Sequence, residues 1–185
     1  MLVTHVTTAQ LEAGLAVISE SPKDAGEVQL IVRRPRVNER EVLEEAQLDL
    51  IDGLAGDTWK FRASSRSTDK KSPHPDMQLN VMNARAVALV AQDPARWALA
   101  GDQLYVDLDL RGANLPPGTR IGIGSAVIEV TSQPHTGCGK FVERFGLDAM
   151  KFVNSSVGRV LNLRGINARV VQAGAIRRGD IARKL

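Results

Sequence analysis

The chain has 185 residues, of which 43% are hydrophobic and 24% are charged, with a formal net charge of +3. This length and composition fit one globular domain and exclude a disordered, collagen-like or coiled-coil chain. The charge excess is too small to indicate a nucleic-acid binder, although it is compatible with an anionic ligand. Because only 4% of the residues are aromatic, few side chains are available to stack on bases. We therefore expect no nucleic-acid partner.

Cysteine and histidine usage narrows the chemistry further. Cys138 is the only cysteine, which excludes an intramolecular disulfide and an all-cysteine zinc site. His5, His74 and His135 do not have the spacing of a zinc motif, so we expect no zinc. Residues 1–15 lack the basic and apolar regions of a secretory signal, and no apolar run is long enough to span a membrane. We expect a cytoplasmic protein with a reduced thiol and no membrane partner.

The first half of the chain predicts a mixture of helices and strands. Thr7 and Gln10 have the spacing of a capping box, and apolar residues at helical intervals follow them. The segment 40–50 fits either a helix or a pair of acidic strands. In chain order, we predict a helix over 7–18, a strand over 27–33, a turn over 52–57, a polar loop over 62–76, a strand over 77–82 and a helix capped by Asn83.

The second half predicts short strands that are separated by glycine turns and one helical insert. We predict strands over 103–110, two within 120–132, then 167–172, 175–178 and 181–182, with the helix over 140–153. Closely spaced short strands favour a barrel. The predicted class is therefore mainly β (α+β): a β-barrel with a few peripheral helices. We expect a single domain over 1–185, with a helical segment over 1–26 and a barrel core over 27–182.

The most informative segment is 133–145 (QPHTGCGKFVERF), in which Cys138 lies between two glycines. A helix is expected to begin just after the cysteine, and Lys140 and Arg144 add positive charge nearby. This setting favours the thiolate, which is the form that attacks, carries sulfur or binds a soft metal. His135 has two interpretations: it is either a base for the thiol or a histidine on the surface. A buried cysteine that acts as a small hydrophobic residue stays open as the alternative.

Two basic regions have open interpretations. Arg66 lies among serines in the 62–76 loop, and it is either part of a solvated loop or a phosphate clamp. Near the C-terminus, basic residues alternate with apolar ones, which predicts solvent-facing positions on barrel strands. These residues are Arg164, Arg169, Arg177, Arg178, Arg183 and Lys184.

Several segments together resemble the MOSC domain, which is named for the C-terminal domain of molybdenum cofactor sulfurase. In chain order they are 53–57 (GLAGD), 110–115 (LRGANL) with 122–130 (GIGSAVIEV), 130–141 (VTSQPHTGCGKF) and 164–180 (RGINARVVQAGAIRRGD). The resemblance covers roughly residues 27–182. The chain differs from the family pattern at Trp59, Ala113 and Gly137, where members often have His, Glu and Pro. These differences suggest a small, stand-alone, bacterial-type member.

The resemblance implies a β-barrel that handles the molybdenum cofactor, with Cys138 as a persulfide carrier or as a molybdenum ligand. A pterin phosphate calls for positive charge and amide groups. Candidate contacts are Arg66, His74, Gln78, Asn83, Asn114 and Lys140. The sulfurase also has an aminotransferase-like domain that this chain lacks, so pyridoxal phosphate is not expected.

Three functions stay open on the sequence. The first is a protein that binds the molybdenum cofactor or a related pterin, with a sulfur-donor protein as a partner. The second is a molybdenum-dependent reductase component that acts on N-hydroxylated compounds and receives electrons from another protein. The third is a non-catalytic barrel that binds a small molecule and has a structural cysteine.

Overall fold

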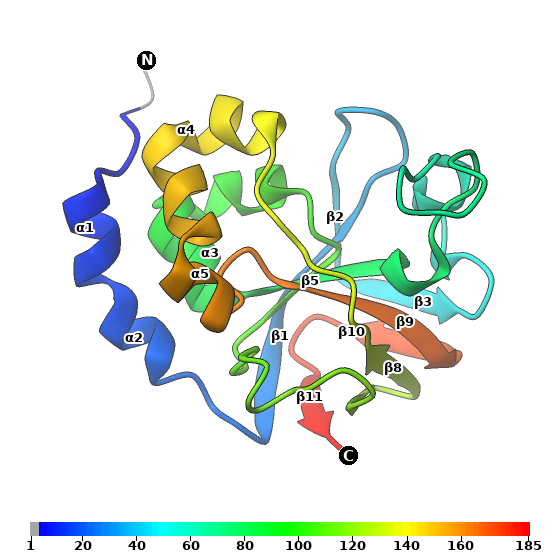
Figure 1. Cartoon of the computed structure of the whole chain (residues 1–185). Helices are drawn as coiled ribbons and strands as arrows, with labels where there is room; N and C mark the ends of the chain where they lie inside the picture. Colours follow the sequence, from blue (N-terminus) through cyan, green and yellow to red (C-terminus); the bar gives the residue numbers. More distant parts are fainter. Residues whose placement is uncertain (1–3) are drawn as a thin grey trace.

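The computed structural model describes residues 4–185, and its central feature is a closed barrel of seven strands. Residues 1–3 of the predicted N-terminal segment lie outside the described part. The helices gather on one side of the barrel, while strands β8, β9 and β11 lie on the opposite side (Figure 1). No helix among residues 4–185 is long and apolar enough to cross a membrane.

The barrel closes because its first and last strands pair with each other. All neighbouring strands are antiparallel except β5 and β6, which run parallel. Around the barrel the strands are β1 (Ala25–Arg33), β11 (Ile181–Lys184), β7 (Arg120–Ile123), β8 (Ala126–Val130), β9 (Ile166–Gln172), β5 (Leu79–Asn83) and β6 (Leu104–Val106). β2 (Glu41–Leu43) adds to β1, and β10 (Gly174–Arg177), β3 (Glu45–Asp49) and β4 (Gly53–Leu54) form a small second sheet. The predicted barrel class is confirmed.

The N-terminal helix begins where the capping box predicts. The Thr7 hydroxyl accepts the Gln10 amide N–H at 3.4 Å, and the Gln10 side chain accepts the Thr7 N–H at 2.9 Å. The helix is divided at Gly14 into α1 (Thr8–Ala13) and α2 (Leu15–Ser19). Of the two interpretations of 40–50, the strand pair is right, as β2 and β3.

The helix cap and the strands predicted around the middle of the chain are confirmed, but the elements begin or end at other residues than predicted. Asn83 caps α3 (Ala84–Ala91), and its side-chain Oδ1 accepts the Ala86 N–H at 2.9 Å. The strand predicted over 103–110 is only three residues long, as β6. Short 3-10 helices that were not predicted surround these elements: η1 (Trp59–Phe61), η2 (Pro75–Met77) and η3 (Pro94–Ala100).

The helical insert is longer than predicted and is interrupted. α4 (Gly139–Asn154) is broken at Gly146, whose φ of 88° lies in the left-handed region that favours glycine. α5 (Ser156–Val160), which was not predicted, follows directly. Phe141 and Phe145 of α4 pack together, with ring centroids 4.9 Å apart.

The fold has two apolar cores. One fills the barrel with branched side chains, including Val28, Ile31 and Leu104. The other lies between the helices and the barrel, and it contains Leu11, Tyr105 and Phe145. The alternation of side chains along each barrel strand explains how one strand serves both cores: in β1, Ile31 faces the first and Val32 the second.

Candidate functional site

Five polar side chains come from the ends of different barrel strands to one place. Arg34 directly follows β1, and Asn80 lies near the start of β5. Asp102 and Arg164 each precede a strand by two residues, β6 and β9, while His135 lies five residues after β8. Residues that are far apart in the sequence therefore meet beside the 131–138 segment.

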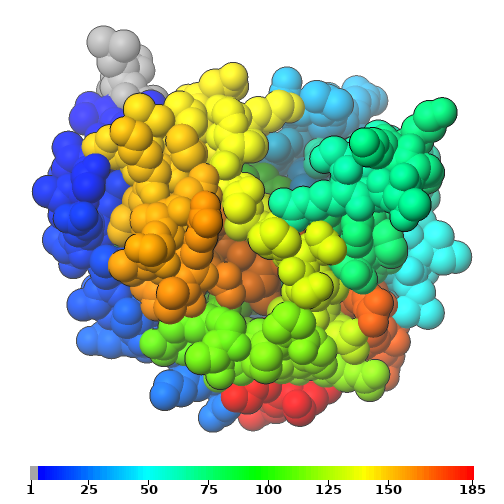
Figure 2. Space-filling model, viewed as in Figure 1, coloured from blue at the N-terminus to red at the C-terminus, as the bar shows by residue number. Residues whose placement is uncertain are grey.

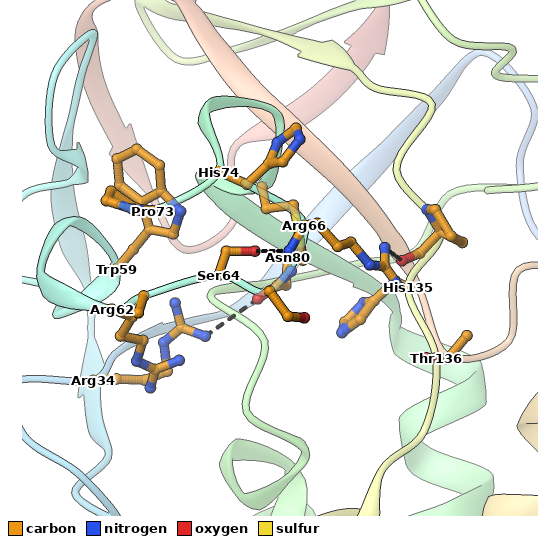
Figure 3. A pocket seen from close by; sticks show the side chains of 14 residues that line it. Arg34, Trp59, Arg62, Ser64, Arg66, Pro73, His74, Asn80, His135 and Thr136 are labelled. Carbon is orange, nitrogen blue, oxygen red and sulfur yellow. Dashed lines mark hydrogen bonds between the residues drawn. The ribbon is translucent and has the colours of Figure 1, made fainter. Parts of the chain in front are cut away.

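A first cavity of about 320 Å³ opens between the 59–77 region and the 131–138 segment. Its lining includes Arg34, Trp59, Arg62, Arg66, His74 and His135 (Figure 3). The Arg66 guanidinium donates to the Pro134 carbonyl oxygen at 2.7 Å, which ties the polar loop to the segment before Cys138. In the space-filling view, the 60–75 region and the 131–138 segment lie against each other (Figure 2).

A second cavity of about 270 Å³ lies next to the first and contains Cys138 in its lining. Arg34, Arg62, Asn80 and His135 line both cavities, so these four residues join them. The cations of the two linings are six arginines and one lysine: Arg34, Arg40, Arg62, Arg66, Arg144, Arg164 and Lys140. No Asp or Glu of the described chain belongs to either lining. We call the two joined cavities the cationic cleft.

A buried ion pair fixes Arg34 at the centre of the cationic cleft. Its guanidinium donates to both carboxylate oxygens of Asp57 at 2.8 Å, and a third nitrogen reaches the Gly101 carbonyl oxygen at 3.0 Å. Asp57 also accepts the Trp59 N–H at 2.8 Å. Burial alone would raise the pKa of Asp57, but the hydrogen bonds and charge of Arg34 hold that pKa below its usual value.

A second buried carboxylate, Asp102, lies between Arg164 and His135. Its Oδ2 accepts from Arg164 at 2.6 Å, while its Oδ1 is 3.4 Å from His135 Nδ1, which is long for a hydrogen bond. Neither Asp102 Oδ1 nor His135 Nδ1 has a hydrogen-bond partner within residues 4–185. Burial, reinforced by Arg164, Arg34 and Arg66, holds the pKa of His135 well below 6.5. The imidazole is therefore neutral at neutral pH, and it is a weaker base than an ordinary histidine.

Cys138 is exposed and is the N-cap residue of α4. Its side chain makes no capping hydrogen bond. The thiol thus has the position that the sequence predicts, at the start of a helix and beside basic residues. The alternative of a buried, small hydrophobic residue is wrong, because that role requires burial in a core.

The structure brings some of the predicted contact residues together and separates others. Arg66 and His74 line the first cavity, Cys138 and Lys140 line the second, and His135 lines both.

Gln78, Asn83 and Asn114 line neither cavity, because their side chains hold the fold together. The Gln78 amide donates to Leu50 and accepts from Val170, and Asn83 bonds Ser21 and Leu108. Asn114 donates to the carbonyl oxygens of Lys23 and Asp109, and it accepts from Lys184. We therefore do not retain these three residues as ligand contacts.

Several residues of the cationic cleft had no sequence signal of their own. The prediction that Arg164 faces solvent is wrong: it is 7% exposed and pairs with Asp102. Arg34, Asn80 and Asp102 were not predicted. Arg34 lies where an apolar strand ends in two consecutive arginines. Two adjacent arginines at the end of an apolar strand are the sequence feature that could have indicated a site residue there.

We predict that Asp102 fixes the tautomer of His135. Burial raises the pKa of Asp102, and Arg164 and Arg34 oppose that rise; the ionised carboxylate favours a proton on Nδ1 of His135 and leaves Nε2 free as an acceptor. In Asp102→Asn, the side-chain oxygen stays with Arg164 and the amide group faces Nδ1, so the proton moves to Nε2. Imidazole ¹⁵N chemical shifts at pH 7 measure the change directly. His74 is the internal control, and a wild-type His135 that is already protonated on Nε2 would contradict the prediction.

Solved structures with the same fold are known. YuaD from Bacillus subtilis aligns with a TM-score of 0.63 and 17% identity, over 85% of this chain and 94% of that chain. YiiM from Escherichia coli aligns with a TM-score of 0.55 and 20% identity, over 86% and 69%. YiiM from Geobacillus stearothermophilus aligns with a TM-score of 0.52 and 13% identity, over 89% and 74%. No protein-family model and no curated protein matches the sequence.

YuaD and YiiM are MOSC-domain proteins. Their likeness to this chain is one of fold, because the identities lie between 13% and 20%. The barrel with its peripheral helices is the architecture that the sequence motifs predict, and the cysteine motif follows β8 as the resemblance requires. The chain thus has the fold of the MOSC domain.

Proposed function

We propose that this protein binds the molybdenum cofactor, or a related phosphorylated pterin, in the cationic cleft, with Cys138 as its reactive sulfur. The observation that supports this proposal most directly is the composition of the cleft: many fixed cations and an exposed thiol in joined cavities. Such a cleft attracts anions by its field. A thiolate adds affinity for a soft metal or for sulfur.

The residues present fit the chemistry of that cofactor. Arg34, Arg62 and Arg66 would hold a phosphate through charge-assisted hydrogen bonds. Asn80 and the serines of the 62–76 loop offer amide and hydroxyl groups for the polar ring edge, and Trp59 offers an aromatic side chain in the same cavity. When bound, the cofactor supplies a redox-active metal with sulfur ligands.

The described residues hold no cluster of three or more His, Cys, Asp or Glu that would bind a metal ion directly. A metal in this cleft would therefore depend on the ligands of the pterin together with Cys138.

Cys138 and His135 supply the protein's own chemistry in this proposal. As a sulfur carrier, the Cys138 thiolate attacks the outer sulfur of a donor persulfide. A new S–S bond forms at Cys138 Sγ as the S–S bond of the donor breaks, and the donor leaves as a thiolate. No external oxidant is needed. His135 lines the same cavity as Cys138, and because its pKa is held well below the usual value it serves as a neutral hydrogen-bonding group there rather than as the acceptor of the thiol proton.

Analysis of freshly purified protein tests the proposed function. The protein is made in a host that synthesises the molybdenum cofactor, and in a matched host that does not. We expect a pterin and molybdenum at near-stoichiometric levels from the first host only, or a persulfide on Cys138 by intact-mass spectrometry from either host, because the persulfide donor does not require the cofactor. Protein that contains no pterin, no molybdenum and no sulfur adduct would overturn the proposal.

A further inference from the structure

The second cavity contains cations that no carboxylate neutralises. Arg34 and Arg164 each have a buried partner, Asp57 and Asp102. Of the four remaining cations of this lining, Arg62 interacts with the charge of Asp57, while Arg40, Arg144 and Lys140 hydrogen-bond only to neutral oxygens within residues 4–185. Arg40 donates to the Glu39 carbonyl at 2.6 Å, Arg144 donates to the Leu99 carbonyl at 2.6 Å, and Lys140 donates to the Asn38 side chain at 3.3 Å.

Arg40 and Arg144 both lie close to Gly101. Gly101 has a φ of +92°, and a Cβ atom there would lie 3.4 Å from an Arg40 nitrogen and 3.8 Å from an Arg144 nitrogen. Partial burial lowers the pKa of Arg40, and Arg144 and Arg34 lower it further. Like charges held this close destabilise each other unless an anion lies between them.

Two arginines of this lining each have a buried donor atom without a partner among residues 4–185. Arg164 is 7% exposed, and its Nε has no hydrogen-bond partner within the described chain. The Arg40 Nε is likewise buried and without a partner. Arg164 and Arg40 therefore keep donor capacity that the described chain does not use.

We propose that Arg40, Lys140 and Arg144 form an oxyanion site that brings an anionic reactant, a phosphate or a carboxylate, to the Cys138 thiol. The proposal extends the proposed function, since it rests on Cys138 being the reactive group. It does not require the cofactor, because these cations line the second cavity and Arg66 and His74 line only the first. Its consequence is charge selectivity: the thiol reacts preferentially with anions.

The single cysteine makes this selectivity directly measurable. Iodoacetate and iodoacetamide both alkylate a thiolate, with an S–C bond formed and iodide released, but only iodoacetate is an anion. We expect the rate ratio of iodoacetate to iodoacetamide on the full chain, made without cofactor, to exceed that of a short cysteine peptide by about tenfold or more. The excess ratio should fall as salt screens the cleft.

Variants and competitors give the test its controls. Arg40→Gln and Arg144→Gln should each lower the rate ratio at least threefold, while Arg183→Gln, which removes an exposed charge outside both linings, should leave it unchanged. Inorganic phosphate or acetate should slow iodoacetate selectively, and the stronger competitor identifies the class of anion.

A wild-type ratio equal to that of the peptide, with no protection by either anion, would overturn the oxyanion site. That result would leave pterin and molybdenum binding, measured separately, intact. Conversely, protein that has the charge selectivity but contains no pterin, no molybdenum and no sulfur adduct would support the oxyanion site and contradict the proposed function.

Discussion

Replacement of Cys138 by alanine should abolish the persulfide adduct, and it should lower the molybdenum content at least about tenfold if the thiol is a metal ligand. The reason is chemical: Cys138 is the only sulfur nucleophile in the chain. Stability should change little, because the side chain is exposed and makes no capping hydrogen bond. Intact mass, metal analysis and thermal unfolding on the same preparation measure all three quantities.

A serine at this position provides the matched control. Ser is a preferred N-cap residue, so Cys138→Ser should keep or slightly raise the stability while it removes the same chemistry. Retention of both the adduct and the metal in either variant would show that the reactive sulfur is not Cys138. Loss of the adduct without loss of metal would identify a carrier, and loss of metal would identify a ligand.

Asp57→Asn, which removes the buried partner of Arg34, should lower the free energy of unfolding by about 3–5 kcal/mol. The change leaves the buried Arg34 charge without its bidentate partner, in a cleft that already contains six other cations. Urea unfolding measures the loss. Glu41→Gln is the matched control: its ion pair with Arg33 is 2.6 Å long but exposed, so it should cost at most about 1 kcal/mol.

The contribution of Asp57 should also depend on pH. Its pKa in the folded protein is held below the ordinary value of 3.8. The unfolded chain therefore binds the proton first, and the stabilisation is complete above pH 3.8 and is lost as the pH falls toward the lower folded pKa. The stability difference between wild type and Asp57→Asn should thus shrink only in this acid range. A difference that is already lost near pH 6 would contradict the assignment.

Features of the fold that depend on near neighbours in sequence were predictable. The Thr7 capping box and the Asn83 cap are both present, because their hydrogen bonds join residues three apart, and the helix that follows Cys138 is present without a side-chain cap. The close spacing of short strands between glycine turns indicated a barrel. Short elements were missed: η1, η2 and η3 contain too few residues for a periodic pattern to be recognised.

The contents of the site were predictable only in part. Cys138, His135 and Lys140 lie on one continuous segment, so their proximity follows from the chain itself. Asn83 and Asn114 were predicted as ligand contacts but line neither cavity. The sequence alone does not distinguish an asparagine whose amide bonds backbone groups from one that binds a ligand. Arg164 was placed on the surface because a charged residue is rarely buried without a partner, and its partner, Asp102, is 62 positions away.

By itself, the sequence determined the class of fold, the ends of the capped helices and the single position at which thiol chemistry can occur. These properties depend on periodicity, composition and contacts between close neighbours. The tertiary structure decided that cations from the 34–40, 62–66, 140–144 and 164 regions surround the thiol, and that Asp102 faces His135. Those arrangements depend on how the strands close into a barrel, which brings distant strand ends together, and the charge of +3 for the whole chain gives no sign of such a concentration.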